Sequence, residues 1–207
     1  MRRAALIAAC VTVCACSKPA LPPEAAATAA APQAAAAGAA SGKITGLVNA
    51  AGAAVVVLQP KTARTFAAQT EKPIMDQAGL MFGPELLLVR TGYPVEFRNS
   101  DDTLHNVRVS HEETRTSAFN VAIPTGEAYT YTFERDGFYR VGCDIHPAMA
   151  ASVFASASPF TAVADGDGSF TFDDVPAGAW TVTVYTGGKQ LHRDVDVGAG
   201  VTAVTIE

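Results

Sequence analysis

The chain of 207 residues has few cysteines, and their placement leaves one of them alone. Three of the four, Cys10, Cys14 and Cys16, lie at the N-terminus, and the fourth is Cys143. A single thiol in the rest of the chain excludes a disulfide framework there. It also argues against a structural zinc site, because such sites are closed by four ligands that usually include several thiolates.

Long apolar runs and excess positive charge are also missing. The apolar run at residues 4–13 is too short to span a bilayer as a helix, and no later segment is long and apolar enough. Asp and Glu number 20 against 15 Lys and Arg, and loss of Arg2 and Arg3 with a signal peptide would change the net charge from −5 to about −7. That balance disfavours nucleic acid and anionic lipid as partners. It permits a basic protein partner, although moderate acidity serves solubility just as often.

The N-terminus predicts export. Two arginines precede the short apolar run, and the following Val13-Cys14-Ala15-Cys16-Ser17 resembles a bacterial lipoprotein signal, in which small residues precede a lipidated Cys. We therefore predict a signal peptide at 1–15, lipidation of Cys16 and an Ala- and Pro-rich tether at 16–41. A lipoprotein signal that ends at Cys10 and an ordinary secretory signal cleaved near Ala15 are the alternatives. Cleavage at either place would also carry the chain across the inner membrane.

From residue 42 to the end, the pattern predicts an all-β protein. Gly, Pro, Asn and Asp separate short β-branched or aromatic runs at intervals of roughly 8–12 residues, as in β-sandwiches. Strands are expected at 86–90, 93–98, 104–109, 129–133, 138–141 and 152–155. Residues 61–71 and 111–120 lack strand character and carry no helix signal.

Four residues have the chemistry of a copper site. Cys143, His146 and Met149 follow one another at three-residue intervals, and His105 lies upstream. Two imidazoles, one thiolate and a weak thioether suit a trigonal copper site with a long axial ligand. A binuclear copper site would need two bridging thiolates. Taken singly, His146 could be a surface residue, Met149 could serve only packing, and a lone Cys could be buried and inert. His111 and His192 lack such neighbours and are expected at the surface.

Residues 72–157 resemble a cupredoxin of the plastocyanin and amicyanin group. One half of the resemblance is Phe82-Gly83-Pro84, then Val95-Glu96-Phe97-Arg98-Asn99-Ser100-Asp101 and His105-Asn106-Val107. The other half is 137–143 with His146 and Met149, where the two-residue spacing between the last two is amicyanin-like. The resemblance implies His105, Cys143 and His146 as equatorial copper ligands and Met149 as the axial one. It also implies that Asn106 braces the loop that bears the thiolate.

Residues 158–207 resemble a carboxypeptidase regulatory-like (transthyretin-like) β-sandwich. Its Asp-Gly turn lies near Asp165 and Asp167, and Pro176-Ala177-Gly178 introduces the next strand. These two aspartates also suggest a calcium loop, but the other EF-hand ligands are missing and a turn is favoured. The first strands of that family have counterparts at 42–60, before the copper module. Because neither segment alone would bury a full core, we expect one sandwich that is split by the cupredoxin.

The whole arrangement resembles exported proteins associated with methylamine utilisation. It implies a periplasmic, lipid-anchored blue (type 1) copper protein that carries single electrons and is not an enzyme. The implied partner is a redox protein such as a dehydrogenase or cytochrome, with no small-molecule substrate. A protein that buffers or delivers copper is the alternative, and a surface scaffold without metal would leave the four ligands unexplained. Inner and outer membrane are both compatible with the sequence.

Overall fold

The structure is a computed structural model that describes residues 40–49 and 52–207. The predicted signal peptide, Cys16 and most of the predicted tether lie outside these residues. The described part consists of sixteen strands without a helix, so the all-β prediction is confirmed. It accordingly contains no helix that could cross a membrane.

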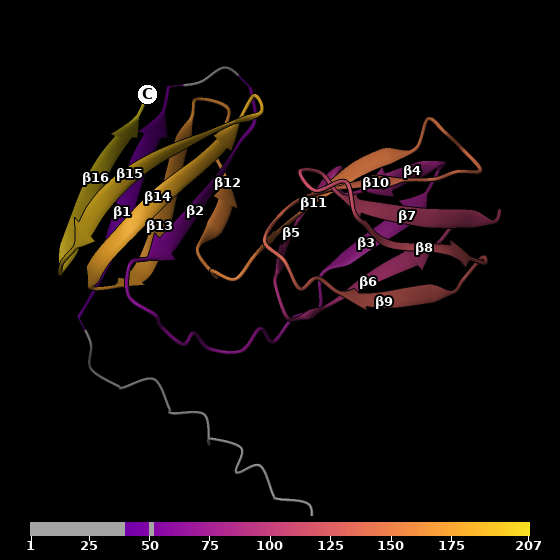
Figure 1. Ribbon diagram of the computed structural model, residues 1–207, viewed down its shortest axis with the longest axis horizontal. Coiled ribbons are helices and arrows are strands. Elements are labelled where there is room, and N and C mark those ends of the chain that lie inside the picture. Colours follow the sequence, from indigo (N-terminus) through magenta and orange to yellow (C-terminus); the bar gives the residue numbers. More distant parts are fainter. Residues whose placement is uncertain (1–39, 50–51) are drawn as a thin grey trace, which may run out of the picture. The chain divides into compact units, whose positions relative to one another are not determined.

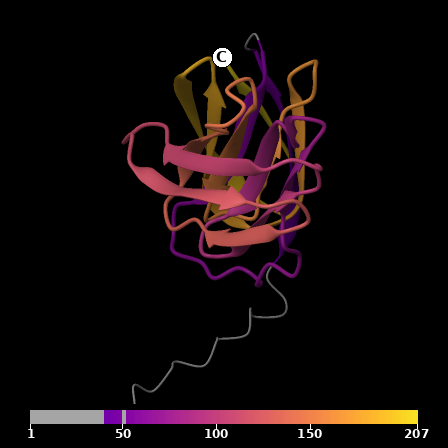
Figure 2. The same ribbon diagram turned by 90° about the vertical axis from the view of Figure 1, so that its right-hand side faces the viewer.

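The middle of the chain folds into one pair of sheets (Figure 1). The first sheet has the order β4-β3-β6-β9, and the second has the order β5-β11-β10-β7-β8. The strands of this inserted sandwich are β3 (Ile74–Ala78), β4 (Met81–Gly83), β5 (Leu86–Arg90), β6 (Pro94–Asn99), β7 (His105–His111), β8 (Ser117–Ile123), β9 (Ala128–Thr132), β10 (Gly137–Gly142) and β11 (Ala150–Ser156). The pink strands that face the viewer in Figure 2 belong to it.

Alternation of apolar and polar residues explains the core of the inserted sandwich. In β6, Val95 and Phe97 are fully buried, whereas Pro94 and Arg98 are exposed. Successive side chains of a strand point to opposite faces, so one face of each strand supplies the core. The cluster formed in this way includes Met75, Phe82, Phe97, Val107, Val109, Phe133, Tyr139, Val141, Val153 and two of the candidate ligands, Cys143 and Met149.

The two ends of the chain fold together into a second pair of sheets. One sheet has the order β13-β1-β16 and the other β12-β2-β14-β15. Their strands are β1 (Ser41–Val48), β2 (Ala54–Pro60), β12 (Thr161–Val163), β13 (Ser169–Pro176), β14 (Gly178–Thr186), β15 (Lys189–Val197) and β16 (Gly200–Ile206). Residues 55–58 pair with β14, residues 55–57 also pair with β12 on the other side, and β1 pairs with β13 and β16. Strands β3 to β11 therefore interrupt this split sandwich between β2 and β12.

One segment that was expected to lack strand character forms part of a strand. Residues 117–120 were expected to lack strand character, but they form the first half of β8, which pairs with β7. Ser, Ala and Asn have little intrinsic preference for strands, so the local sequence carries a weak signal. Phe119 supplies the missing stabilisation because its ring centroid lies 5.2 Å from that of Phe97 and 4.6 Å from that of Tyr131. Tertiary packing and pairing with β7 thus override the local pattern.

Candidate metal centre

The strand order brings the candidate ligands to one end of the inserted sandwich. β10 pairs antiparallel with β11, with Gly142 opposite Ala150, so residues 143–149 form the loop that closes this hairpin. β10 also pairs antiparallel with β7, with Gly142 opposite Arg108. The end of β10 therefore lies beside the start of β7, where His105 is the first residue.

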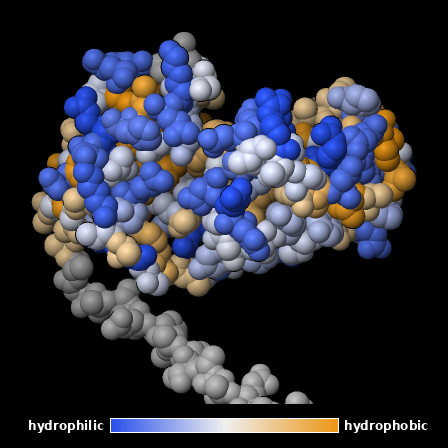
Figure 3. All heavy atoms as spheres, in the orientation of Figure 1, coloured by the Kyte–Doolittle hydropathy of each residue, from blue (hydrophilic) through white to orange (hydrophobic). Residues whose placement is uncertain are grey.

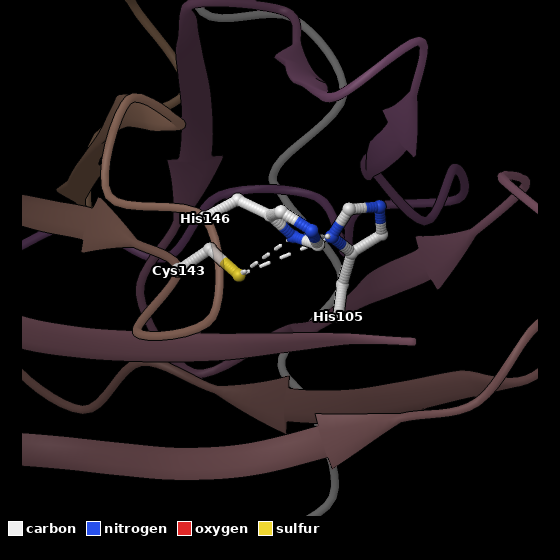
Figure 4. A group of neighbouring side chains, drawn as sticks. All are labelled: His105, Cys143 and His146. Atoms are coloured by element: carbon white, nitrogen blue, oxygen red, sulfur yellow. Dashed lines mark hydrogen bonds between the residues drawn. The ribbon is translucent and has the colours of Figure 1, made fainter. Parts of the chain in front are cut away.

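Three donor atoms converge at this end (Figure 4). Cys143 Sγ lies 3.9 Å from His105 Nδ1 and 3.8 Å from His146 Nδ1, and the two nitrogens are 3.0 Å apart. His105 is fully buried, Cys143 is 3% exposed and His146 is half-buried. The arrangement shields two donors from water and leaves the third at the surface.

The triangle of donor atoms has the size that a single metal ion needs. A point about 2.0 Å from both nitrogens, the length of a metal–nitrogen bond, can lie about 2.2 Å from the sulfur, so one ion there would have close to a typical metal–thiolate distance. Imidazole and thiolate are ligands that copper prefers, whereas calcium and magnesium take oxygen. The residues present therefore fit copper.

Met149 lies at the end of the same loop and is 2% exposed. Its backbone N–H donates to the carbonyl of His146 over 2.9 Å, and its own carbonyl accepts from the Cys143 N–H over 3.4 Å. Met149 thus fixes the loop through its backbone, and its side chain joins the core beside Cys143. The axial role of its sulfur stays a prediction.

Asn106, the residue after His105, contacts the ligand loop as the cupredoxin resemblance implies. Its Oδ1 accepts the N–H of Asp144 over 2.7 Å and that of Ile145 over 3.3 Å, and it lies 3.4 Å from Cys143 Sγ. Its Nδ2 donates to Asn120 Oδ1 over 2.8 Å and to Asp144 Oδ2 over 3.2 Å. Every polar atom of this buried amide therefore has a partner, which fixes its orientation.

Two carboxylates at the site were not found by the sequence analysis. Asp101 Oδ2 lies 2.8 Å from His105 Nε2, on the far side of the ring from the cysteine. Asp144 forms an ion pair with Arg108 over 2.7 Å. The pKa of Asp101 is held below its ordinary value mainly by the hydrogen bond from the N–H of Leu80 and next by that of the His105 ring. Arg108, and next Asn120, do the same for the pKa of Asp144.

The two histidines outside the cluster differ from each other. His192 is exposed, as expected. His111 is 5% exposed, so the surface prediction for it is wrong. Its Nδ1 accepts the N–H of Thr114, its Nε2 lies 3.2 Å from the Asp136 carbonyl, and Tyr139 packs on its ring edge-to-face. These contacts give His111 a structural role in the turn between β7 and β8.

Comparison with known proteins identifies the class of the inserted sandwich. Residues 69–155 match the family of copper binding proteins of the plastocyanin/azurin type. This part of the chain is therefore a cupredoxin domain, and copper is the cofactor of its His-Cys-His cluster. The match covers fewer than half of the residues, and it includes neither β1 and β2 nor β12 to β16.

Solved structures similar to this chain include copper proteins of several kinds. A copper-containing nitrite reductase from Thermus scotoductus SA-01 is 27% identical with a TM-score of 0.38, and the match covers 47% of this chain and 25% of that one. Reduced amicyanin, in a single-residue variant, is 22% identical with a TM-score of 0.38, covering 47% and 97%. A purple cupredoxin from Nitrosopumilus maritimus is 22% identical with a TM-score of 0.37, covering 41% and 100%. The chain thus spans a quarter of the reductase. A search of curated proteins finds no match.

Proposed function

We propose that this protein carries single electrons on one type 1 copper ion held by His105, Cys143 and His146, with Met149 as axial ligand. The observation that supports this most directly is that the three donor atoms already lie 3.0 to 3.9 Å apart within the folded chain. Copper held by these residues would supply a one-electron change between its cupric and cuprous states. Ligands that are fixed beforehand need little rearrangement when the charge changes.

The loop is held from several sides, which supports rapid electron exchange. Asn106 Oδ1 accepts two backbone N–H groups of the loop, the Met149 carbonyl accepts the N–H of Cys143, and the Met149 N–H donates to the carbonyl of His146. The ion pair between Arg108 and Asp144 holds the outer side of the loop. Because Cys143 and His105 are buried, water has little access to the ligands.

His146 is the exit that we propose for the electron. Its ring is half-buried, and its loop neighbours Ile145, Pro147 and Ala148 are exposed. Leu104, beside His105, is 48% exposed and Ile145 is 46% exposed. Figure 3 shows hydrophobic atoms gathered at the right-hand end of the surface, over the ends of β4 and β7 in the matching view of Figure 1. A redox protein with an apolar contact surface is the partner that such an end would accept.

Reconstitution with copper tests this function and separates it from copper delivery. Adding copper to the purified apo-protein should give an intense sulfur-to-copper charge-transfer band that bleaches on reduction and returns on oxidation, with copper retained throughout. Ready loss of copper to a chelating acceptor in either state would favour delivery instead. Cys143→Ser should abolish the band while His192→Ala, at an exposed histidine outside the cluster, should keep it. A band that survives Cys143→Ser would reject the ligand assignment.

We further propose that the protein is exported to the periplasm and anchored there by lipid on Cys16. The N-terminal pattern of residues 1–17 supports this, and residues 16–41 would then act as the tether. Mass spectrometry of the purified protein should find a lipid-modified Cys16 at the new N-terminus. A mature chain that starts elsewhere without lipid would contradict the anchor.

The split sandwich is proposed to be of the carboxypeptidase regulatory-like type and to serve as a spacer or docking module. The antiparallel pairing of β2 with β14 and of β1 with β13 supports joining the two ends of the chain into one such unit. A variant in which residues 70–157 are replaced by a short linker should still fold if this is right. Its Trp180 would then report a cooperative transition, whereas a disordered product would contradict the proposal.

A further inference from the structure

The buried histidine of the centre has a carboxylate on its outer nitrogen. His105 Nδ1 faces Cys143 and His146, and His105 Nε2 lies 2.8 Å from Asp101 Oδ2. The His105 ring is fully buried, so water cannot take the place of this partner. The proton on the ring therefore has one suitable acceptor at Nε2, which leaves the lone pair of Nδ1 directed at the copper position.

Asp101 lies in the loop between β6 and β7 and is itself held by the turn between β3 and β4. The N–H of Gly79 donates to its Oδ1 over 2.5 Å, and the N–H of Leu80 donates to its Oδ2 over 3.0 Å. Both donors lie in the turn between β3 and β4 and have φ values of +62° and +60°. A leucine in this left-handed region is disfavoured. The conformation directs two adjacent N–H groups at one carboxylate.

We propose that Asp101 is a positioning residue that fixes the tautomer of His105 and biases the bound copper toward the cupric state. A carboxylate that accepts the Nε2 proton makes the opposite nitrogen a stronger donor. Its negative charge also favours the more highly charged form of a nearby ion. Both effects act in the same direction and lower the reduction potential of the centre. The inference needs copper at the three ligands, but it does not depend on electron transfer to a partner.

The chain offers a matched control at the next position. Asp102 is exposed, and no hydrogen bond of its side chain is found among the described residues. Asp101→Asn and Asp102→Asn therefore remove the same charge from adjacent positions, but only the first changes the group bonded to His105. A difference between the two variants isolates the hydrogen bond from the general effect of charge.

The first measurement needs no copper. Long-range nitrogen–proton NMR correlations of the apo-protein should show His105 with its proton on Nε2, and Asp101→Asn should weaken that preference while Asp102→Asn keeps it. A wild-type ring that carries its proton on Nδ1 would overturn the inference even if the Asp101 variant failed to fold. An Asp101→Asn ring with an unchanged tautomer would also count against it.

The second measurement compares the two oxidation states of copper. Competition with chelators should show that Asp101→Asn loses about 10–100-fold in cupric affinity and less in cuprous affinity. Each tenfold loss of cupric affinity relative to cuprous affinity raises the reduction potential by about 59 mV. Asp102→Asn should change the ratio much less. Equal effects of the two variants, or no effect of Asp101→Asn, would refute the role assigned to Asp101.

Discussion

The brace formed by Asn106 gives a prediction whose size follows from its contacts. Asn106→Ala removes the acceptor of two loop N–H groups and the donor to Asn120 and Asp144. A hydrogen bond contributes about 0.5–1.5 kcal/mol net, and the partners here are partly exposed and can recover water. We therefore expect the cupredoxin domain of the apo-protein to lose about 2–4 kcal/mol of stability.

Three spectroscopic signals can follow the cupredoxin domain and the split sandwich separately. The charge-transfer band reports on the copper loop, and Trp180, the single tryptophan, lies in β14 of the split sandwich. Denaturant unfolding of the Asn106→Ala protein should shift near-ultraviolet signals of the cupredoxin tyrosines and speed copper loss, with a smaller change in the tryptophan transition. Asn120→Ala keeps the backbone contacts of Asn106 and should cost less than about 1 kcal/mol. If Asn106→Ala stays within about 0.5 kcal/mol of wild type, the bracing role is wrong.

Three further changes test other parts of the molecule. A methyl group at Gly46 would lie 2.1 Å from the Phe170 ring. Gly46→Ala should therefore destabilise the split sandwich by about 1–3 kcal/mol, measured by unfolding followed with tryptophan fluorescence. Gly166 has open space around it, so the control Gly166→Ala should be nearly neutral. The pKa of Glu96 is held below its ordinary value of 4.5, mainly by Lys72 and next by Arg98. The ionised Glu96 therefore stabilises the fold above pH 4.5, and this contribution is lost as the pH falls through the lowered pKa. Melting of the apo-protein at decreasing pH should therefore show a smaller loss in Glu96→Gln, and equal curves would contradict the assignment. Ile145→Lys would place like charges opposite each other when two copies of the protein meet at the His146 end. NMR line broadening should then show that electron self-exchange is slowed about tenfold or more. An unchanged rate would contradict the proposal that the electron leaves through His146.

The sequence predicted the parts of the site that depend on residue type and spacing. Cys143 and His146 share a loop, so their proximity follows from the spacing alone. The approach of His105 followed from the cupredoxin resemblance, and the structure explains it by the pairing of β7 with β10. The strands with regular alternation, such as β6, were also predicted correctly.

The rest depends on contacts between segments that are distant in the sequence. Asp101 lies four residues before His105, but that spacing in a loop gives no signal until the Gly79–Leu80 turn is placed against it. The first half of β8 was missed because Phe119 acquires its strand conformation from packing across the sandwich. His111 looked like a surface residue because its partner, the Asp136 carbonyl, comes from the connection between β9 and β10, 25 residues further along the chain.

X-ray absorption at the copper edge of the loaded protein tests the central claim most directly. The account predicts one sulfur at about 2.2–2.3 Å and two imidazole nitrogens at about 2.0 Å from a single copper ion. A first shell without the short sulfur, or with only one imidazole, would show that His105, Cys143 and His146 do not share the ion.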